Sequence, residues 1–64
     1  MYNIGDLYRK TISINNNKFE YEYYIIIDWW KDECGLIYIR IENTETGARF
    51  DIEEFLMNYM DKVV

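Results

Sequence analysis

The 64-residue chain has no histidine and no proline, one cysteine and three glycines that stand far apart. Without histidine it lacks the commonest general base and metal ligand, which excludes catalytic triads that need an imidazole. Cys34 cannot form an internal disulfide, and the neighbouring Asp32 and Glu33 oppose its activation as a nucleophile. These three side chains also lack further spaced ligands for a metal ion. Isolated glycines cannot build a phosphate-binding loop. We therefore expect no enzyme, no metal and no cofactor.

Long apolar runs are also missing from the chain. No run approaches the ~18 residues that a membrane span requires, and no basic-then-apolar signal follows Met1. Half of the residues are nevertheless hydrophobic and 19% are aromatic, which favours a folded chain over a disordered one. The length predicts a single domain, 1–64, and the lone thiol fits a soluble protein of a reducing cytoplasm.

Positive charge is scarce, because seven Lys and Arg face twelve Asp and Glu for a net charge of −5. Such a surface repels nucleic acid and attracts a basic protein partner, although it also simply keeps a small protein soluble. A series of carboxylates near the C-terminus is a candidate for electrostatic steering, or for imitation of a phosphate backbone. Its members are Glu42, Glu45, Asp51, Glu53, Glu54 and Asp61.

The segment Phe19–Trp30 alternates like a strand and then becomes apolar on both faces. Its odd positions are all apolar and predict a core face opposite Ile37, Ile39 and Ile41. Its even positions change from glutamate to apolar residues, and antiparallel pairing would bring them close to the start of the next strand. The resulting aromatic patch is a candidate partner-binding site or a second part of the core. It comprises Tyr24, Ile26, Trp30, Leu36 and Tyr38.

The remaining elements follow from turn residues and spacing. Strands are expected at 6–14, 18–30, 36–43 and 48–52, joined by an asparagine turn at 15–17 and by turns at 31–35 and 44–47. Apolar residues then recur at spacings of three and four, which predicts a helix from about 52 to 62 with Asp51 as its cap. The fold class is mainly β: a small four- to five-stranded antiparallel meander that forms a half-open barrel. If the helix covers the aromatic patch, the patch is core; if the helix plugs the barrel end, the patch stays open.

Two segments carry a resemblance to a known architecture. Residues 4–8, Ile-Gly-Asp-Leu-Tyr, look like the opening of many bacterial SH3-like barrels, and residues 43–50, ending Thr-Gly-Ala-Arg-Phe, resemble their distal hairpin. Similar small acidic barrels with a terminal helix occur in phages and other mobile elements. Residues 28–31 are similar to the tryptophan pair of peptide-binding SH3 domains, but the other parts of that proline-binding groove are missing. The resemblance therefore implies a fold and no activity.

These observations favour a non-enzymatic protein-binding module, for example a phage or mobile-element inhibitor that occludes a host protein. Aromatic anchors would supply affinity and carboxylates would steer the protein toward a basic surface. The alternative is a homo-oligomer, such as a homodimer, that pairs through the same aromatic face. Binding of single-stranded nucleic acid by exposed aromatics is disfavoured by the negative charge.

Overall fold

A computed structural model describes residues 2–15 and 18–63 of the protein. These residues form one antiparallel sheet of five strands in the order β4-β3-β2-β1-β5, and the sheet does not close into a barrel. A short 3-10 helix, η1, precedes the last strand. The elements are β1 (Leu7–Asn15), β2 (Lys18–Lys31), β3 (Ile37–Asn43), β4 (Arg49–Glu53), η1 (Glu54–Tyr59) and β5 (Asp61–Lys62).

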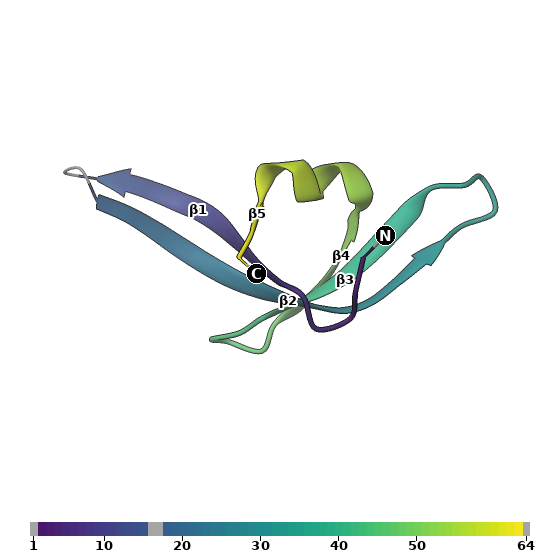
Figure 1. Ribbon diagram of the computed structural model, residues 1–64, viewed down its shortest axis with the longest axis horizontal. Coiled ribbons are helices and arrows are strands. Elements are labelled where there is room, and N and C mark those ends of the chain that lie inside the picture. Colours follow the sequence, from purple (N-terminus) through teal and green to yellow (C-terminus); the bar gives the residue numbers. More distant parts are fainter. Residues whose placement is uncertain (1, 16–17, 64) are drawn as a thin grey trace.

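Strand β2 runs along most of the molecule and links its two halves. Its first half pairs with β1 and its second half with β3, so the two hairpins extend in opposite directions (Figure 1). Both ends of the sheet curve toward the side on which η1 lies. We call this side the concave face and the opposite side the outer face. The radius of gyration is 12.6 Å, against about 11 Å for a compact domain of this length.

A β-bulge in β2 determines which side chains face the core. Ile26 pairs with Ile41 but Asp28 pairs with Arg40, so Ile27 has no partner of its own in the β2–β3 ladder. An extra residue reverses the alternation of every side chain after it. The even positions therefore point inward before the bulge, and the odd positions point inward after it.

The predicted faces of this strand are accordingly only partly right. The prediction that its odd positions form the core is wrong for Phe19 and Tyr23, which are exposed, whereas Tyr24 and Ile26 are buried. It holds for Trp29, which lies beyond the bulge and packs against the core. The inward orientation of Ile37, Ile39 and Ile41 is confirmed, since β3 has no bulge.

The core is small and lies under η1. Its buried members come from the centre of the sheet, with one residue from η1: Tyr24, Ile26, Ile39, Ile41 and Met57. Several half-buried side chains surround them, Tyr8, Trp29 and Ile52 among these. Because a core of this size supplies little stability, each of its members matters more than it would in a larger domain.

The predicted C-terminal α-helix is not what the chain forms. Ile52 belongs to β4, and only the six residues of η1 are helical. Asp51 does not cap a helix, because its carboxylate accepts two hydrogen bonds from Arg40 across the sheet. A 3-10 helix aligns residues three apart. Met57 thus belongs to the core, and Met60, three residues later, packs against it.

The two predicted turns within the described residues are confirmed, and each depends on one side chain. In the β2–β3 turn, the Oδ1 atom of Asp32 accepts hydrogen bonds from two backbone N–H groups, at 2.9 and 2.8 Å. In the β3–β4 turn, Oδ1 of the buried Asn43 does the same, at 2.9 and 3.0 Å. Gly47 completes this second turn with a φ of +77°, which favours glycine. The expected asparagine turn at 15–17 lies partly outside the described residues.

The β1–β2 hairpin extends beyond the core as an arm with its own aromatic ladder. Phe19 stacks on Tyr21 at a centroid distance of 6.2 Å, and Tyr21 lies 6.4 Å from Tyr23. The guanidinium of Arg9 lies over the Tyr21 ring at 4.4 Å. It also reaches Asp61 of β5 at 4.0 Å. Local contacts along the arm therefore replace a core there.

We predict that Ile39→Val lowers the free energy of unfolding by about 0.5–1.5 kcal/mol, because Ile39 is fully buried and loses one packed methyl group. Urea unfolding followed by circular dichroism measures the change. The matched control is Ile12→Val on the exposed arm, which should leave stability nearly unchanged. Equal losses in the two variants would show that Ile39 is not central to the core.

Candidate binding groove and outer aromatic cluster

An open groove of about 590 Å³ lies on the concave face, between β1, β4 and η1. Its floor consists of the buried Tyr24 and Ile41, and its walls carry the exposed side chains of Phe50, Leu56 and Tyr59. Tyr59 is the most open of these, with 74% of its surface accessible. The full lining is Lys10, Thr11, Tyr24, Ile41, Phe50, Ile52, Leu56, Tyr59 and Met60.

The groove exists because the sheet remains open between β1 and β4. Within the described residues, β5 pairs with β1 only at Tyr8 and Arg9, so the following residues Lys10 and Thr11 stand at the groove wall. β4 forms the opposite wall as the last strand of the sheet. The chain crosses above this gap in η1 (Figure 1). The groove is thus the place where a closed barrel would have joined its edges.

Polar contacts hold the Tyr24 ring in the floor of the groove. Its hydroxyl donates a hydrogen bond to Oε1 of Glu22 at 3.0 Å, and Nδ2 of Asn43 lies 3.5 Å from the other oxygen of that carboxylate. Burial raises the pKa of Tyr24, and the hydrogen bond to Glu22 raises it further. The ring meets Phe50 edge to face at 6.2 Å. The floor of the groove is therefore fixed before any ligand arrives.

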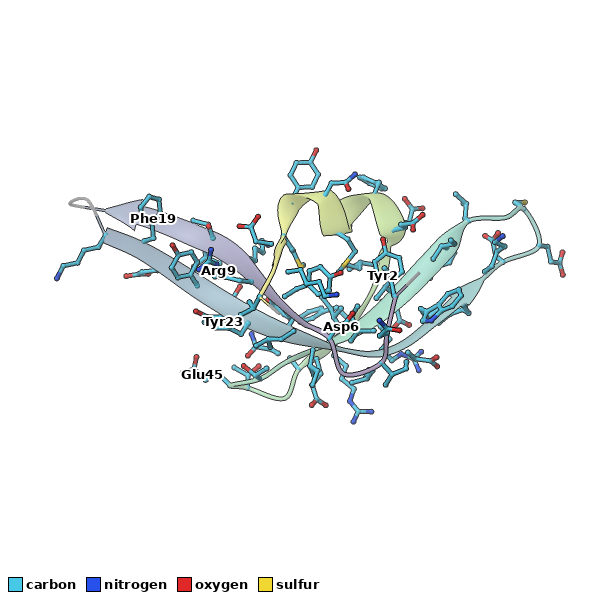
Figure 2. All side chains as sticks on the ribbon, viewed as in Figure 1. Tyr2, Asp6, Arg9, Phe19, Tyr23 and Glu45 are labelled. Carbon is cyan, nitrogen blue, oxygen red and sulfur yellow. The ribbon has the colours of Figure 1, made fainter. Side chains whose placement is uncertain are left out.

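Contacts from the N-terminal segment brace η1 beside the groove. Tyr2 lies on the concave side near η1 (Figure 2) and packs against the core. Burial and the Glu54 carboxylate raise the pKa of Tyr2 to about 12. Lys62 of β5 lies 3.4 Å from Asp6, at the other end of the same segment. Both sides of η1 are thus tied to residues that precede β1.

The outer face carries a separate aromatic cluster. Trp30 and Tyr38, opposite each other on β2 and β3, stack at 5.9 Å. The guanidinium of Arg40 lies over Trp30 at 5.1 Å and binds both oxygens of Asp51, at 2.7 and 3.0 Å. The hydrogen bonds from Arg40 lower the pKa of Asp51, and those to Asp51 raise the pKa of Arg40. We call Trp30, Tyr38, Arg40 and Asp51 the outer cluster.

The structure divides the predicted partner-binding patch between two faces. Tyr24 and Ile26 are buried at 7% and 0% exposure, so for these two residues the core alternative is right. The cause is the bulge at Ile27, which separates them from Trp30. Only Trp30 and Tyr38 meet on the outer face, with Leu36 exposed at the adjacent hairpin.

The predicted carboxylate series does not form one acidic surface. Arg49 binds Glu42 at 2.9 Å, Arg40 binds Asp51, and Arg9 approaches Asp61. Glu54 begins η1, where it raises the pKa of Tyr2, while Glu53 ends β4 half-buried. Glu45 lies in the β3–β4 turn, on the side of the molecule away from η1 (Figure 2). Exposed pairs of this kind contribute little stability but neutralise much of the local charge.

Sequence reasoning missed the walls of the groove. Phe50, Leu56 and Tyr59 were assigned to the buried faces of a strand and a helix, although they are exposed. Nothing in the sequence indicated that the helix would be short. An α-helix over 52–62 would have buried its whole apolar stripe, whereas η1 has only six residues. Lys10 and Thr11 gave no signal, since they become groove residues only because β5 is so short.

Other site types find no support in the described part of the chain. No group of three or more Cys, Asp or Glu side chains there is placed to hold a metal ion, and Cys34 is exposed in a hairpin turn. No helix there is long and apolar enough to cross a membrane. Comparison with protein-family models, curated proteins and solved structures found no match.

We predict that the stabilising effect of Asp51 disappears in acid. Because its folded-state pKa is lowered, the pair with Arg40 stabilises the fold above the ordinary carboxyl pKa of about 3.9 and loses this effect as pH falls through the folded-state value. The melting temperature of Asp51→Asn should therefore lie below that of the wild type at neutral pH and converge with it as the pH falls through the lowered folded-state pKa of Asp51.

The control for this measurement is Glu45→Gln in the β3–β4 turn, where the backbone N–H of residue 45 donates to Oδ1 of Asn43 and the side chain takes no part in this hydrogen bond. It should melt like the wild type throughout. A gap between wild type and Asp51→Asn that is independent of pH would show that the Arg40 pair does not cause the difference.

Proposed function

We propose that this protein is a non-enzymatic protein-binding module that holds an apolar segment of a partner protein in the concave groove. One observation carries the proposal: an open groove with a rigid apolar floor is flanked by large side chains that the fold leaves exposed. Binding sites for small molecules and peptides are typically concave and mostly apolar, with a few polar groups.

The exposed side chains are the main support. Phe50, Leu56 and Tyr59 line the groove, and Phe55 is exposed beside them on η1. Contiguous apolar surface is uncommon on monomers and marks interaction sites, and aromatic residues in particular act as anchors. The core gains nothing from these side chains in their exposed positions. Contact with a partner would explain why a chain of this size carries them.

The charge of the chain defines the class of partner. With a net charge of −5, the protein attracts basic surfaces from a distance even though several carboxylates are paired. Lys10 and Thr11 supply the polar positions of the wall. The partner segment is accordingly apolar with Lys or Arg nearby, and binding would act by occlusion of that surface.

The finer parts of this proposal concern fold family and origin. We propose that the open sheet is a variant of the SH3-like small barrel, because its last strand returns to pair with its first. An inhibitor from a phage or mobile element is the biological role that agrees with the resemblance of residues 4–8 and 43–50. Its target would be a basic protein surface, including one that normally binds nucleic acid.

A random peptide library tests the groove directly. Peptides selected on the immobilised protein should combine aromatic or aliphatic residues with Lys or Arg. In calorimetric titrations, Leu56→Asn and Tyr59→Ser should each weaken the best peptide about tenfold or more, because both remove anchoring contacts from exposed positions.

Matched controls are Leu36→Asn and Trp30→Ala, which alter apolar surface away from the groove. Both should bind the peptide as the wild type does, and circular dichroism verifies that all variants are folded. Loss of binding in these controls with full binding in the groove variants would contradict the proposal, as would a library that yields no peptide.

A further inference from the structure

Strand β4 offers unpaired backbone groups on its outer side. As the last strand in the sheet, it pairs only with β3 among the residues that the structure describes. At the turn, the N–H of Asn43 donates to the C=O of Ala48, and its C=O accepts from the N–H of Gly47, so the odd residues of β3 direct their backbone groups toward β4. The backbone groups of their partners in β4, Phe50 and Ile52, are therefore occupied. Because antiparallel ladders alternate, the N–H groups of Arg49, Asp51 and Glu53 and the C=O groups of Arg49 and Asp51 point away from β3. The C=O of Glu53, the N-cap of η1, accepts the first hydrogen bond of that helix.

The sequence of β4 is complementary to itself when it is reversed. Two copies of Arg-Phe-Asp-Ile-Glu, antiparallel and centred on Asp51, place Arg49 of each copy opposite Glu53 of the other. Phe50 then faces Ile52 of the second copy on the concave side. All three outward-pointing residues of each strand fall at hydrogen-bonded positions in this register. Because η1 uses the C=O of Glu53, the pairing supplies four backbone hydrogen bonds, two ion pairs and two apolar contacts.

The centre of this pairing brings two Asp51 side chains together, which would normally be unfavourable. Each of these carboxylates is already bound through both oxygens by Arg40 of its own chain, at 2.7 and 3.0 Å. The local charge at the symmetry axis is therefore balanced. A slip by two residues shortens the ladder to three paired positions in either direction. One slip opposes Asp51 and Glu53, and the other opposes Arg49 and Asp51 but leaves Glu53 without a partner.

We propose that two copies of this chain associate through β4 to form a symmetric dimer with a continuous ten-stranded sheet. A two-fold axis through Asp51 relates the copies, and the same strand is used on both sides. β4 carries charged side chains but no proline or bulge to block pairing, and its charges match a second copy. The inference does not rest on the proposed function, although two groove residues, Phe50 and Ile52, also lie at this interface.

Charge reversal tests the register. Arg49→Glu places two glutamates opposite each other at both ends of the pairing, and Glu53→Arg places two arginines there. In sedimentation equilibrium from micromolar to millimolar concentration, the wild type should dimerise and each variant alone should do so about tenfold or more weakly. An equimolar mixture should form a heterodimer, because every end then pairs an acid with a base.

Dimerisation of the mixture would show that each variant alone fails to dimerise because of its charges. A variant that had lost its fold would not dimerise in the mixture either. Glu53→Pro tests the backbone bonds: Glu53 has φ of −72°, which suits proline, and its N–H points outward. This variant should be a folded monomer, whereas Glu53→Gln should still dimerise.

Three results would overturn the proposal. A wild type that stays monomeric at millimolar concentration excludes the dimer. A mixture of charge variants that does not associate excludes the register. A dimer that survives Glu53→Pro but is lost in Trp30→Ala would place the interface at the outer cluster instead. Because Phe50 and Ile52 line the groove as well as the proposed interface, the peptide titration is also carried out on the monomeric Glu53→Pro variant. Peptide binding by this variant keeps the groove proposal separate from the dimer.

Discussion

The irregular pairing at Ile27 is the constraint on which most of this structure depends. β2 has apolar residues on both faces in its second half, so alternation alone cannot decide which of them are inside. One unpaired residue settles the matter by sending Tyr24 and Ile26 inward before the bulge and Trp29 inward after it. It also turns Trp30 to the outer face, where Trp30 stacks on Tyr38 and lies under the guanidinium of Arg40. The floor of the groove and the outer cluster are thus set by the same local irregularity.

Because the core is small, the fold depends on η1, the segment that follows β4, to cover it. The sheet has only one well-covered region, and η1 contributes its single buried residue, Met57, at that point. η1 contacts the core through Met57, and Tyr2 packs beside it. These contacts keep the six residues in place although no side chain caps the start of the helix. Its remaining apolar side chains have no protein surface to cover. The groove and its exposed walls follow from a covering element that is too short for the sheet beneath it.

The sequence predicted the elements better than their faces. Strand positions, two turns and the inward side of β3 follow from alternation and turn chemistry, which act locally. The bulge was not predicted, because the odd positions from Phe19 to Trp29 are all apolar and an unbroken alternation already gives them a core face. The predicted helix failed for a related reason: its stripe of apolar residues has helical spacing, but Asp51 and Ile52 were recruited by β3. Groove residues such as Phe50 and Leu56 could not be separated from core residues by hydrophobicity alone.

The aromatic ladder of the arm has a consequence for how the molecule moves. Phe19, Tyr21 and Tyr23 contact one another along a single strand, so their contacts persist only while the hairpin stays paired. The arm has no second layer that would tie its opening to the unfolding of the core. Local stability should consequently fall along β2 from Trp29 toward Phe19, and amide protons near the arm's tip should exchange before those beside Ile39. The β1–β2 arm should therefore unfold locally while the core under η1 remains folded.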